Sequence, residues 1–108
     1  MRYRFLQDRL VDTVLLSPGA APESLRRAVL ERAKVPRGAQ SDLPPAVTHY
    51  VDTVARNAWQ VTDADVAALQ QAGHSDDSIF EITVAAALGA ALHRLNRGLA
   101  ALAGKETN

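Results

Sequence analysis

Four side chains in this sequence are of types that commonly contact small molecules, and we treat them as candidate ligand-binding residues: His49, Trp59, Glu81 and His93. His49 precedes Asp52 by three residues, a spacing at which a helix would let the carboxylate orient the imidazole as a base. His93 is followed by Arg94 and Arg97, which together could bind an anion. A solvated surface position is the alternative for each histidine, so no residue is assigned a catalytic role.

The sequence also excludes several kinds of chemistry. The chain contains no cysteine, which rules out thiol redox cycling, disulfides and thiolate metal ligands. Its three histidines lack the spacing that would place two metal ligands on one helix face, and no glycine-rich phosphate loop is present. We therefore expect neither a metal ion nor a cofactor.

Charge and hydropathy describe an ordinary globular chain. The 12 basic and 12 acidic residues among 108 balance and are mixed along the sequence, which argues against nucleic acid or an anionic membrane as a partner. The first ten residues carry four charges, and the longest uncharged run, 82–92, is too short to span a bilayer. We expect a cytoplasmic protein without a signal peptide.

The elements that must position these residues are helices. Proline, glycine and polar caps divide the chain into five helical segments and no strand, with boundaries near 2–16, 22–34, 44–59, 62–73 and 76–103. The sequence predicts a single all-α domain over 1–108. Within it we expect a helical pair (1–34), a loop (35–43), a helical core (44–103) and a short tail (104–108).

Apolar periodicity and polar caps predict how these helices are oriented. The first helix has an apolar stripe that we expect to face inward, formed by Tyr3, Leu6, Leu10, Val11 and Val14. The third helix is amphipathic, with Val47, Tyr50, Val51, Val54 and Ala55 on its apolar face. Caps of known type are predicted around the fourth helix: Thr62 with Asp65, Gly73 at its end, and Ser75 before the last helix.

The last helix is apolar on every side in its middle. Residues 82–92 read ITVAAALGAAL, and such a helix is covered all round, either by the core or by a partner chain. A chain of 108 residues has few elements with which to surround it, so we expect self-association through the 76–103 helix. The alternative is that the alanines only supply helix propensity.

The segment 57–99 resembles the alkylhydroperoxidase D-like, or carboxymuconolactone decarboxylase, superfamily. The resemblance lies in a short helix ending in Ala72-Gly73, a capped SDDSIFE start and a long helix of small residues. It covers about 40% of the chain. It implies an all-helical fold of that type, which assembles into dimers, trimers or hexamers through these helices.

The Cys-x-x-Cys motif of the thiol-dependent members is absent. Trp59 and Thr62 stand where the resemblance places the two cysteines, and the following histidine position falls on Asp65 or Val66. Glu81 matches a glutamate that is common at the start of the family's long helix. Trp59 either fills the pocket of the missing redox centre or is an ordinary core or interface aromatic. We expect no thiol peroxidase activity.

These observations support three functional hypotheses. The leading one is a non-redox, homo-oligomeric helical protein that acts as a binding or accessory module, with a small-molecule ligand allowed. The second is a cofactor-free enzyme acting on a small organic acid, as in the decarboxylase branch, which requires His49, Glu81 or His93 to converge in a cleft. The third is a heteromeric partner of a cysteine-bearing homologue.

Overall fold

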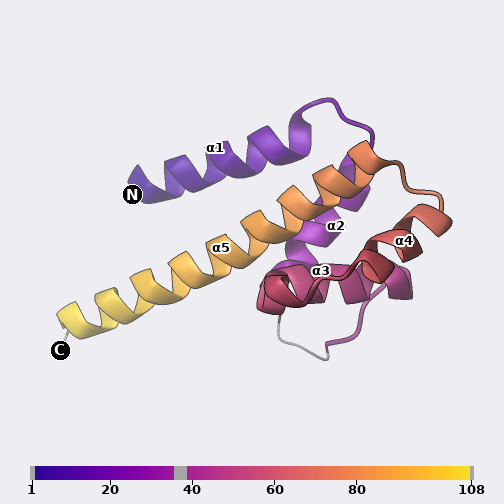
Figure 1. Ribbon diagram of the computed structural model, residues 1–108. Helices are drawn as coiled ribbons and strands as arrows, with labels where there is room; N and C mark the ends of the chain where they lie inside the picture. Colours follow the sequence, from indigo (N-terminus) through magenta and orange to yellow (C-terminus); the bar gives the residue numbers. More distant parts are fainter. Residues whose placement is uncertain (1, 36–38, 108) are drawn as a thin grey trace.

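Five α-helices and one 3-10 turn make up the part of the chain that the computed structural model describes, residues 2–35 and 39–107. In chain order they are α1 (Arg2–Leu16), α2 (Glu23–Lys34), α3 (Pro45–Asn57), η1 (Ala58–Gln60), α4 (Asp63–Gln71) and α5 (Asp76–Thr107). No strand occurs within these residues, so the predicted all-α fold is confirmed. Figure 1 shows the long α5 with the other four helices arranged around it.

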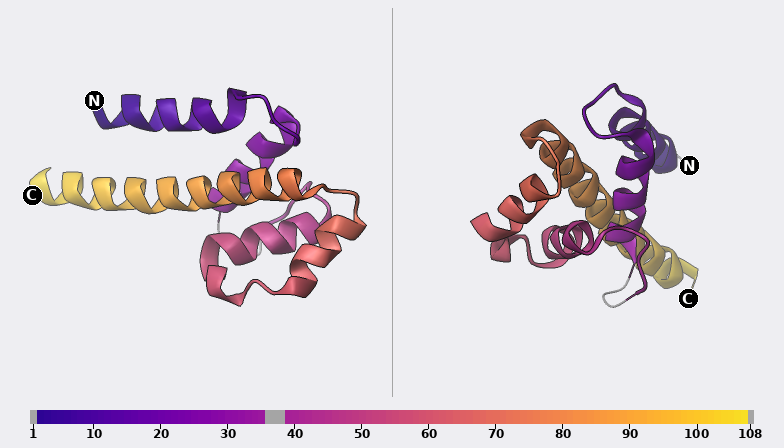
Figure 2. Two further views of the ribbon diagram at one scale, coloured as in Figure 1. Left: turned by 45° about the horizontal axis from the view of Figure 1, so that its top comes forward. Right: turned by 90° about the vertical axis from the view of Figure 1, so that its right-hand side faces the viewer.

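The core forms where α5 packs against α2 and α3 (Figure 2). Its fully buried side chains come from four helices: Val29, Leu30, Val47, Val51, Leu69 and Ile82. Helices α2 and α5 approach closely at Gly89, where a Cβ atom would overlap the carbonyl oxygen of Leu30 and lie 2.8 Å from Ala33 Cβ. Packing of α5 against α2 therefore requires the glycine at position 89.

The predicted caps around α4 are all present. Thr62 Oγ1 accepts a hydrogen bond from Asp65 N at 3.3 Å, and Asp65 Oδ2 accepts one from Thr62 N at 3.0 Å, which together form a capping box. Gly73 has a φ of 99°, a conformation that favours glycine. Ser75 Oγ then accepts from Ser78 N at 3.1 Å and caps α5. The capping box fixes where α4 begins, and the Ser75 cap fixes where α5 begins.

Arginine side chains bind the carbonyl ends of three helices. The pairs are Arg26 with Val14 and Ser17, Arg56 with Val35, and Arg94 with Ala55. The last carbonyl groups of a helix have no partner within it and carry partial negative charge, so a guanidinium group is a suitable donor. In each case the arginine belongs to a different helix from the carbonyl group, and the bond therefore fixes one helix against another.

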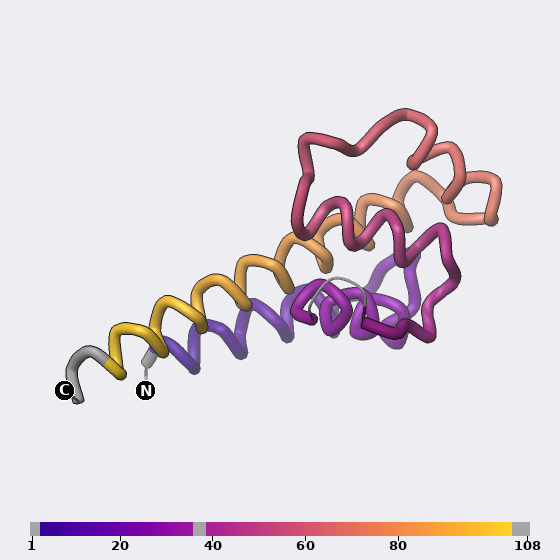
Figure 3. The backbone as a smooth tube through the Cα atoms, turned by 90° about the horizontal axis from the view of Figure 1, so that it is seen from below, coloured from indigo at the N-terminus to yellow at the C-terminus, as the bar shows by residue number. Residues whose placement is uncertain are grey.

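The first half of α1 and the second half of α5 form an antiparallel pair that extends away from the other helices (Figures 2 and 3). We call residues 2–12 and 92–107 the α1–α5 arm. The 32 residues of α5, at about 1.5 Å each, account for most of the 52 Å length of the molecule. A cavity of 480 Å³ lies between the two helices of the arm, lined among others by Tyr3, Val11, Leu92 and Leu99.

Two predictions require correction. The apolar stripe of α1 is not buried as a whole, because only α2 and α5 lie beside α1: Leu6 and Leu10 are more than half exposed, and Leu15 is the fully buried residue instead. The predicted tail 104–108 is helical as far as Thr107, since good helix formers precede it and no proline interrupts it. The predicted loop 35–43 is non-helical at 39–43, and its residues 36–38 lie outside the described part of the chain.

Candidate functional site

The four candidate ligand-binding residues lie on separate parts of the molecule. His49 is on α3, Trp59 is on η1, Glu81 is near the start of α5, and His93 is in the second half of α5. Four cavities of 220 to 480 Å³ occur among the described residues, and no two of these four side chains line the same one. The described part of a single chain therefore does not bring them together in a common cleft.

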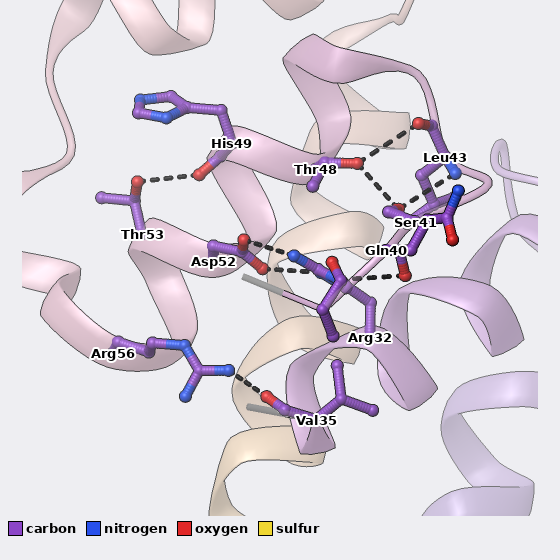
Figure 4. Close-up of polar contacts among 11 residues, drawn as sticks. Arg32, Val35, Gln40, Ser41, Leu43, Thr48, His49, Asp52, Thr53 and Arg56 are labelled. Atoms are coloured by element: carbon purple, nitrogen blue, oxygen red, sulfur yellow. Dashed lines mark hydrogen bonds and ion pairs between the residues drawn. The ribbon is translucent and has the colours of Figure 1, made fainter. Parts of the chain in front are cut away.

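His49 has a different acidic neighbour from the one that the sequence predicted. Its Nε2 lies 3.3 Å from Asp65 Oδ1, and its side chain is 68% exposed. In Figure 4 the His49 ring points away from Asp52, whose carboxylate binds Arg32 instead. The hydrogen bond from Thr62 N is the main cause that lowers the pKa of Asp65, and the nearby His49 acts in the same direction. The predicted His49–Asp52 pair is thus replaced by a surface contact between α3 and the cap of α4.

Glu81 holds the loop between α1 and α2. Its two carboxylate oxygens accept hydrogen bonds from Ala20 N at 2.8 Å and Ala21 N at 2.9 Å. These bonds, the one from Ala21 first, lower the pKa of Glu81 below its usual range. Gly19 leaves the necessary space, because a Cβ atom there would overlap the carboxylate. Both oxygens are occupied by backbone groups, so the geometry of Glu81 is that of a fold-stabilising residue.

Trp59 lies on the surface at the position where the family resemblance places a cysteine. Its side chain is 79% exposed, and it lines none of the four cavities. The segment around it is the turn η1, followed by the Thr62 cap of α4. Trp59 is therefore not a core aromatic of the single chain and does not fill a redox-type pocket.

A buried ion pair between α2 and α3 is the polar site that the sequence analysis missed (Figure 4). Arg32 donates from Nε and Nη2 to the two oxygens of Asp52 at 2.9 and 2.8 Å, and its side chain is only 6% exposed. A third donor, Nη1, binds the carbonyl groups of Ala39 and Gln40. The hydrogen bonds to Asp52 raise the pKa of Arg32. The two residues are 20 positions apart, so no local spacing could have revealed the pair.

The surface best suited to binding a macromolecule is an apolar row along α5. Its members recur every three or four residues and therefore share one side of the helix: Phe80, Val84, Ala87, Ala91, Leu95, Gly98 and Leu102. All seven are exposed, whereas Ile82, Ala85 and Ala86 on the opposite side are buried in the core. The helix that the sequence predicted to be covered all round is thus covered by this chain on one side only.

Helix α1 widens this row. It faces α5 with residues that line the cavities between the two helices, including Tyr3, Val11 and Val14. At about 100° per residue, Leu6 lies about 60° and Leu10 about 20° from Tyr3 around the helix, away from Val11. Both leucines are more than half exposed, and their half of α1 runs antiparallel beside the second half of α5 (Figure 2). We call Leu6, Leu10 and the seven residues of the α5 row the apolar face.

A second, polar cavity contains the remaining candidate residue, His93. It has a volume of 280 Å³ and lies where α5 meets α2 and α3. Three of its lining residues are Arg56, His93 and Arg94, and the other three are alanines, namely Ala33, Ala55 and Ala90. No acidic side chain lines it. Its chemistry is suited to an anion, as the sequence suggested for His93 and Arg94.

Metal and membrane sites were considered for the same part of the chain. No group of three or more His, Asp or Glu side chains in residues 2–35 and 39–107 could hold a metal ion. Among the described helices, the segment 76–104 of α5 is long and apolar enough to cross a membrane, with a mean hydropathy of 1.3 over its most apolar window. That window is 44% buried inside the molecule, and core helices of soluble proteins meet the same criterion.

Comparison of the chain with known proteins found no matching family model, curated protein or solved structure. The fold and site themselves define the class: an all-helical protein whose longest helix has one side in the core and one apolar side exposed. The resemblance of 57–99 to alkylhydroperoxidase D-like proteins stays a prediction from the sequence.

Proposed function

We propose that this protein is a self-associating helical module: two copies pair through the apolar face, and the dimer is a binding or accessory component without thiol redox activity. The row of exposed apolar residues on α5 carries the proposal. From Phe80 to Leu102 it is about 33 Å long, at roughly 1.5 Å per residue. An exposed apolar surface of this extent marks an interaction site in a protein that remains in solution.

A second copy of the chain fits this surface because the row is complementary to itself when two α5 helices run antiparallel. With the twofold axis at Ala91, the middle residue of the row, Leu95 lies opposite Ala87 of the partner subunit. Val84 then lies opposite Gly98 of the partner subunit. Large side chains meet small ones at these pairs, which permits close helix packing near the axis. At the two ends of the row, Phe80 lies opposite Leu102 of the partner subunit. Each contact also occurs twice, as a twofold interface requires.

The charges along α5 favour the same orientation. Asp76 and Asp77 lie at its start, whereas His93, Arg94 and Arg97 lie in its second half. Antiparallel pairing keeps the two acidic helix starts apart, and it also aligns the two helix dipoles favourably. Parallel pairing would bring like charges together, so it is disfavoured.

A lipid bilayer is the competing occupant of an apolar helix. The structure favours a protein partner, because the side of α5 opposite the apolar row is already packed against α2 and α3. The balanced net charge of the chain also provides no attraction to anionic lipid. Self-association is in addition the behaviour that the alkylhydroperoxidase D-like resemblance implies, and we include that relationship in the proposal.

The test is the molar mass in solution, measured by size-exclusion chromatography with light scattering at micromolar concentration. We expect about 23 kDa for the wild type, twice the chain mass of 11.6 kDa. Leu95→Glu places a charge in the apolar row and should give the monomer mass. Leu16→Glu is the matched control, because Leu16 is 59% exposed but lies outside the apolar face.

Three outcomes contradict the proposal. A wild-type monomer at micromolar concentration removes the self-association. Monomers that bind neutral lipid vesicles show that the bilayer is the occupant of the apolar face. Turnover of a peroxide with a dithiol donor above the buffer rate overturns the assignment as a non-redox protein.

A further inference from the structure

We propose that the cavity formed by Arg56, His93 and Arg94 is a binding site for a small oxyanion of the phosphate type. The site uses other side chains than the apolar face: Arg94 borders the apolar row on α5, but none of the nine residues of the apolar face lines the cavity. The proposal rests on hydrogen-bond donors without acceptors, on net local charge and on the size of the cavity.

Both guanidinium groups have donors to spare. Arg56 donates from Nη2 to Val35 O (Figure 4), and Arg94 donates from Nη2 to Ala55 O at 2.9 Å. A guanidinium group has five N–H donors, so most of them remain for a ligand. Moreover, Arg56 Nε is buried and has no acceptor among the described residues. Leaving such a donor without an acceptor costs free energy.

The local charge is positive after the helix ends are counted. The carbonyl ends of α2 and α3 each contribute roughly half a negative charge, and the two arginines contribute two positive charges. About one positive charge remains before His93 is included. The acidic residue nearest in sequence on α3 is Asp52, one turn before Arg56, and both of its oxygens are bound by Arg32. The arginines of the cavity therefore have no carboxylate partner in the structure described.

The cavity has the size of a small ligand. Its volume of 280 Å³ is several times the roughly 30 Å³ that one water molecule occupies in the liquid. Alanines at positions 33, 55 and 90 keep the space open between the cationic side chains. Planar guanidinium groups bind phosphate oxygens in pairs, which suits two arginines that line one cavity.

The experiment titrates the 108-residue protein with inorganic phosphate and measures binding by calorimetry and by the melting temperature, with sodium chloride at matched ionic strength as the reference. We expect saturable binding and a melting temperature that rises with phosphate but not with chloride. An acetate series distinguishes a phosphate-type site from a general carboxylate site. Arg94→Gln should weaken phosphate binding about tenfold, as expected for the loss of one charge-assisted contact.

Two further variants keep the test decisive. Arg97→Gln is the control, because Arg97 is exposed on the same helix and does not line the cavity; it should bind phosphate like the wild type. His93→Gln removes a side chain that is exposed and should weaken binding a few-fold without unfolding the protein. The proposal is overturned if phosphate has no more effect than chloride, if acetate binds as tightly as phosphate, or if Arg94→Gln and Arg97→Gln lose affinity equally.

Discussion

At the scale of single residues, Glu81 illustrates how one side chain links distant parts of this fold. It lies on α5, yet it binds the backbone N–H groups of Ala20 and Ala21, about 60 positions earlier in the chain. These groups immediately precede α2, where the positive end of the helix dipole favours a carboxylate. These hydrogen bonds favour the charged carboxylate and therefore lower the pKa of Glu81.

Glu81→Gln should destabilise the protein by about 1 kcal/mol near pH 7, because the amide has only one acceptor oxygen and its NH2 group leaves one of the two backbone N–H groups without an acceptor. This value is the low end of the roughly 1 to 3 kcal/mol that the loss of a hydrogen-bond partner costs, because solvent screens a partly exposed group. The folded pKa of Glu81 lies below its reference value of 4.5, so its stabilisation is present above that pH and is lost as the pH falls through the folded pKa.

Urea unfolding of wild type and variant at about pH 7 and about pH 3 measures this effect. The difference in free energy of unfolding should shrink at the lower pH. Glu31→Gln is a suitable control, since Glu31 is exposed and its side chain pairs with Lys34 on the same helix at 3.4 Å. A difference between wild type and Glu81→Gln that stays constant with pH would show that the carboxylate charge is not responsible.

At the scale of helices, α5 has two sides with different packing. Its buried side has small residues, and at Gly89 it lies so close to α2 that a Cβ atom would overlap the Leu30 carbonyl group. Its exposed side has larger apolar residues, such as Phe80, Leu95 and Leu102, that touch no other helix of this chain enough to be buried. One helix therefore supplies both the core contact and the proposed interface.

Gly89→Ala should destabilise the protein by about 1 to 3 kcal/mol, because the added methyl group would overlap the Leu30 carbonyl and push α2 away from α5. The overlap outweighs the gain in helix propensity of about 1 kcal/mol. Gly104→Ala is the matched control: a Cβ atom there meets nothing within 4 Å, so it should be neutral or slightly stabilising. Thermal unfolding of both variants provides the measurement, and equal melting temperatures would contradict the close approach.

At the scale of the whole molecule, the α1–α5 arm is the least enclosed part of the structure. The 480 Å³ cavity lies between its two helices, and Leu6, Leu10 and Leu102 are exposed on the arm outside this cavity. A small domain can bury only part of its apolar surface. Pairing of two arms would cover the surface that a single chain leaves open.

The melting temperature of the wild type should therefore rise with protein concentration, because association stabilises the folded state by mass action. Scanning calorimetry over a hundredfold concentration range measures the shift. Leu95→Glu should melt at a lower temperature that does not depend on concentration. If the melting temperature of the wild type did not depend on protein concentration, the arm would be stable in the monomer and the predicted association would be wrong.

Much of the local structure could be predicted from the sequence because it depends on neighbouring residues. The capping box of Thr62 and Asp65, the positive φ of Gly73 and the amphipathic α3 all arise from interactions within a few positions. The residues that could carry chemistry were predicted with less success. His49 does not pair with Asp52, and Trp59 is on the surface, because both outcomes depend on which helix lies next to α3.

The sequence by itself determined the class of fold and the absence of thiol chemistry, since helix periodicity, caps and the lack of cysteine are properties of the chain alone. Only the tertiary structure decided that Arg32 binds Asp52, that Glu81 holds the α1–α2 loop, and that α5 leaves one apolar side exposed. These features join residues 20 to 61 positions apart or depend on which side of a helix finds a neighbour. They arise only when the helices pack, because packing selects which side of each helix meets another helix and which side remains open for a partner.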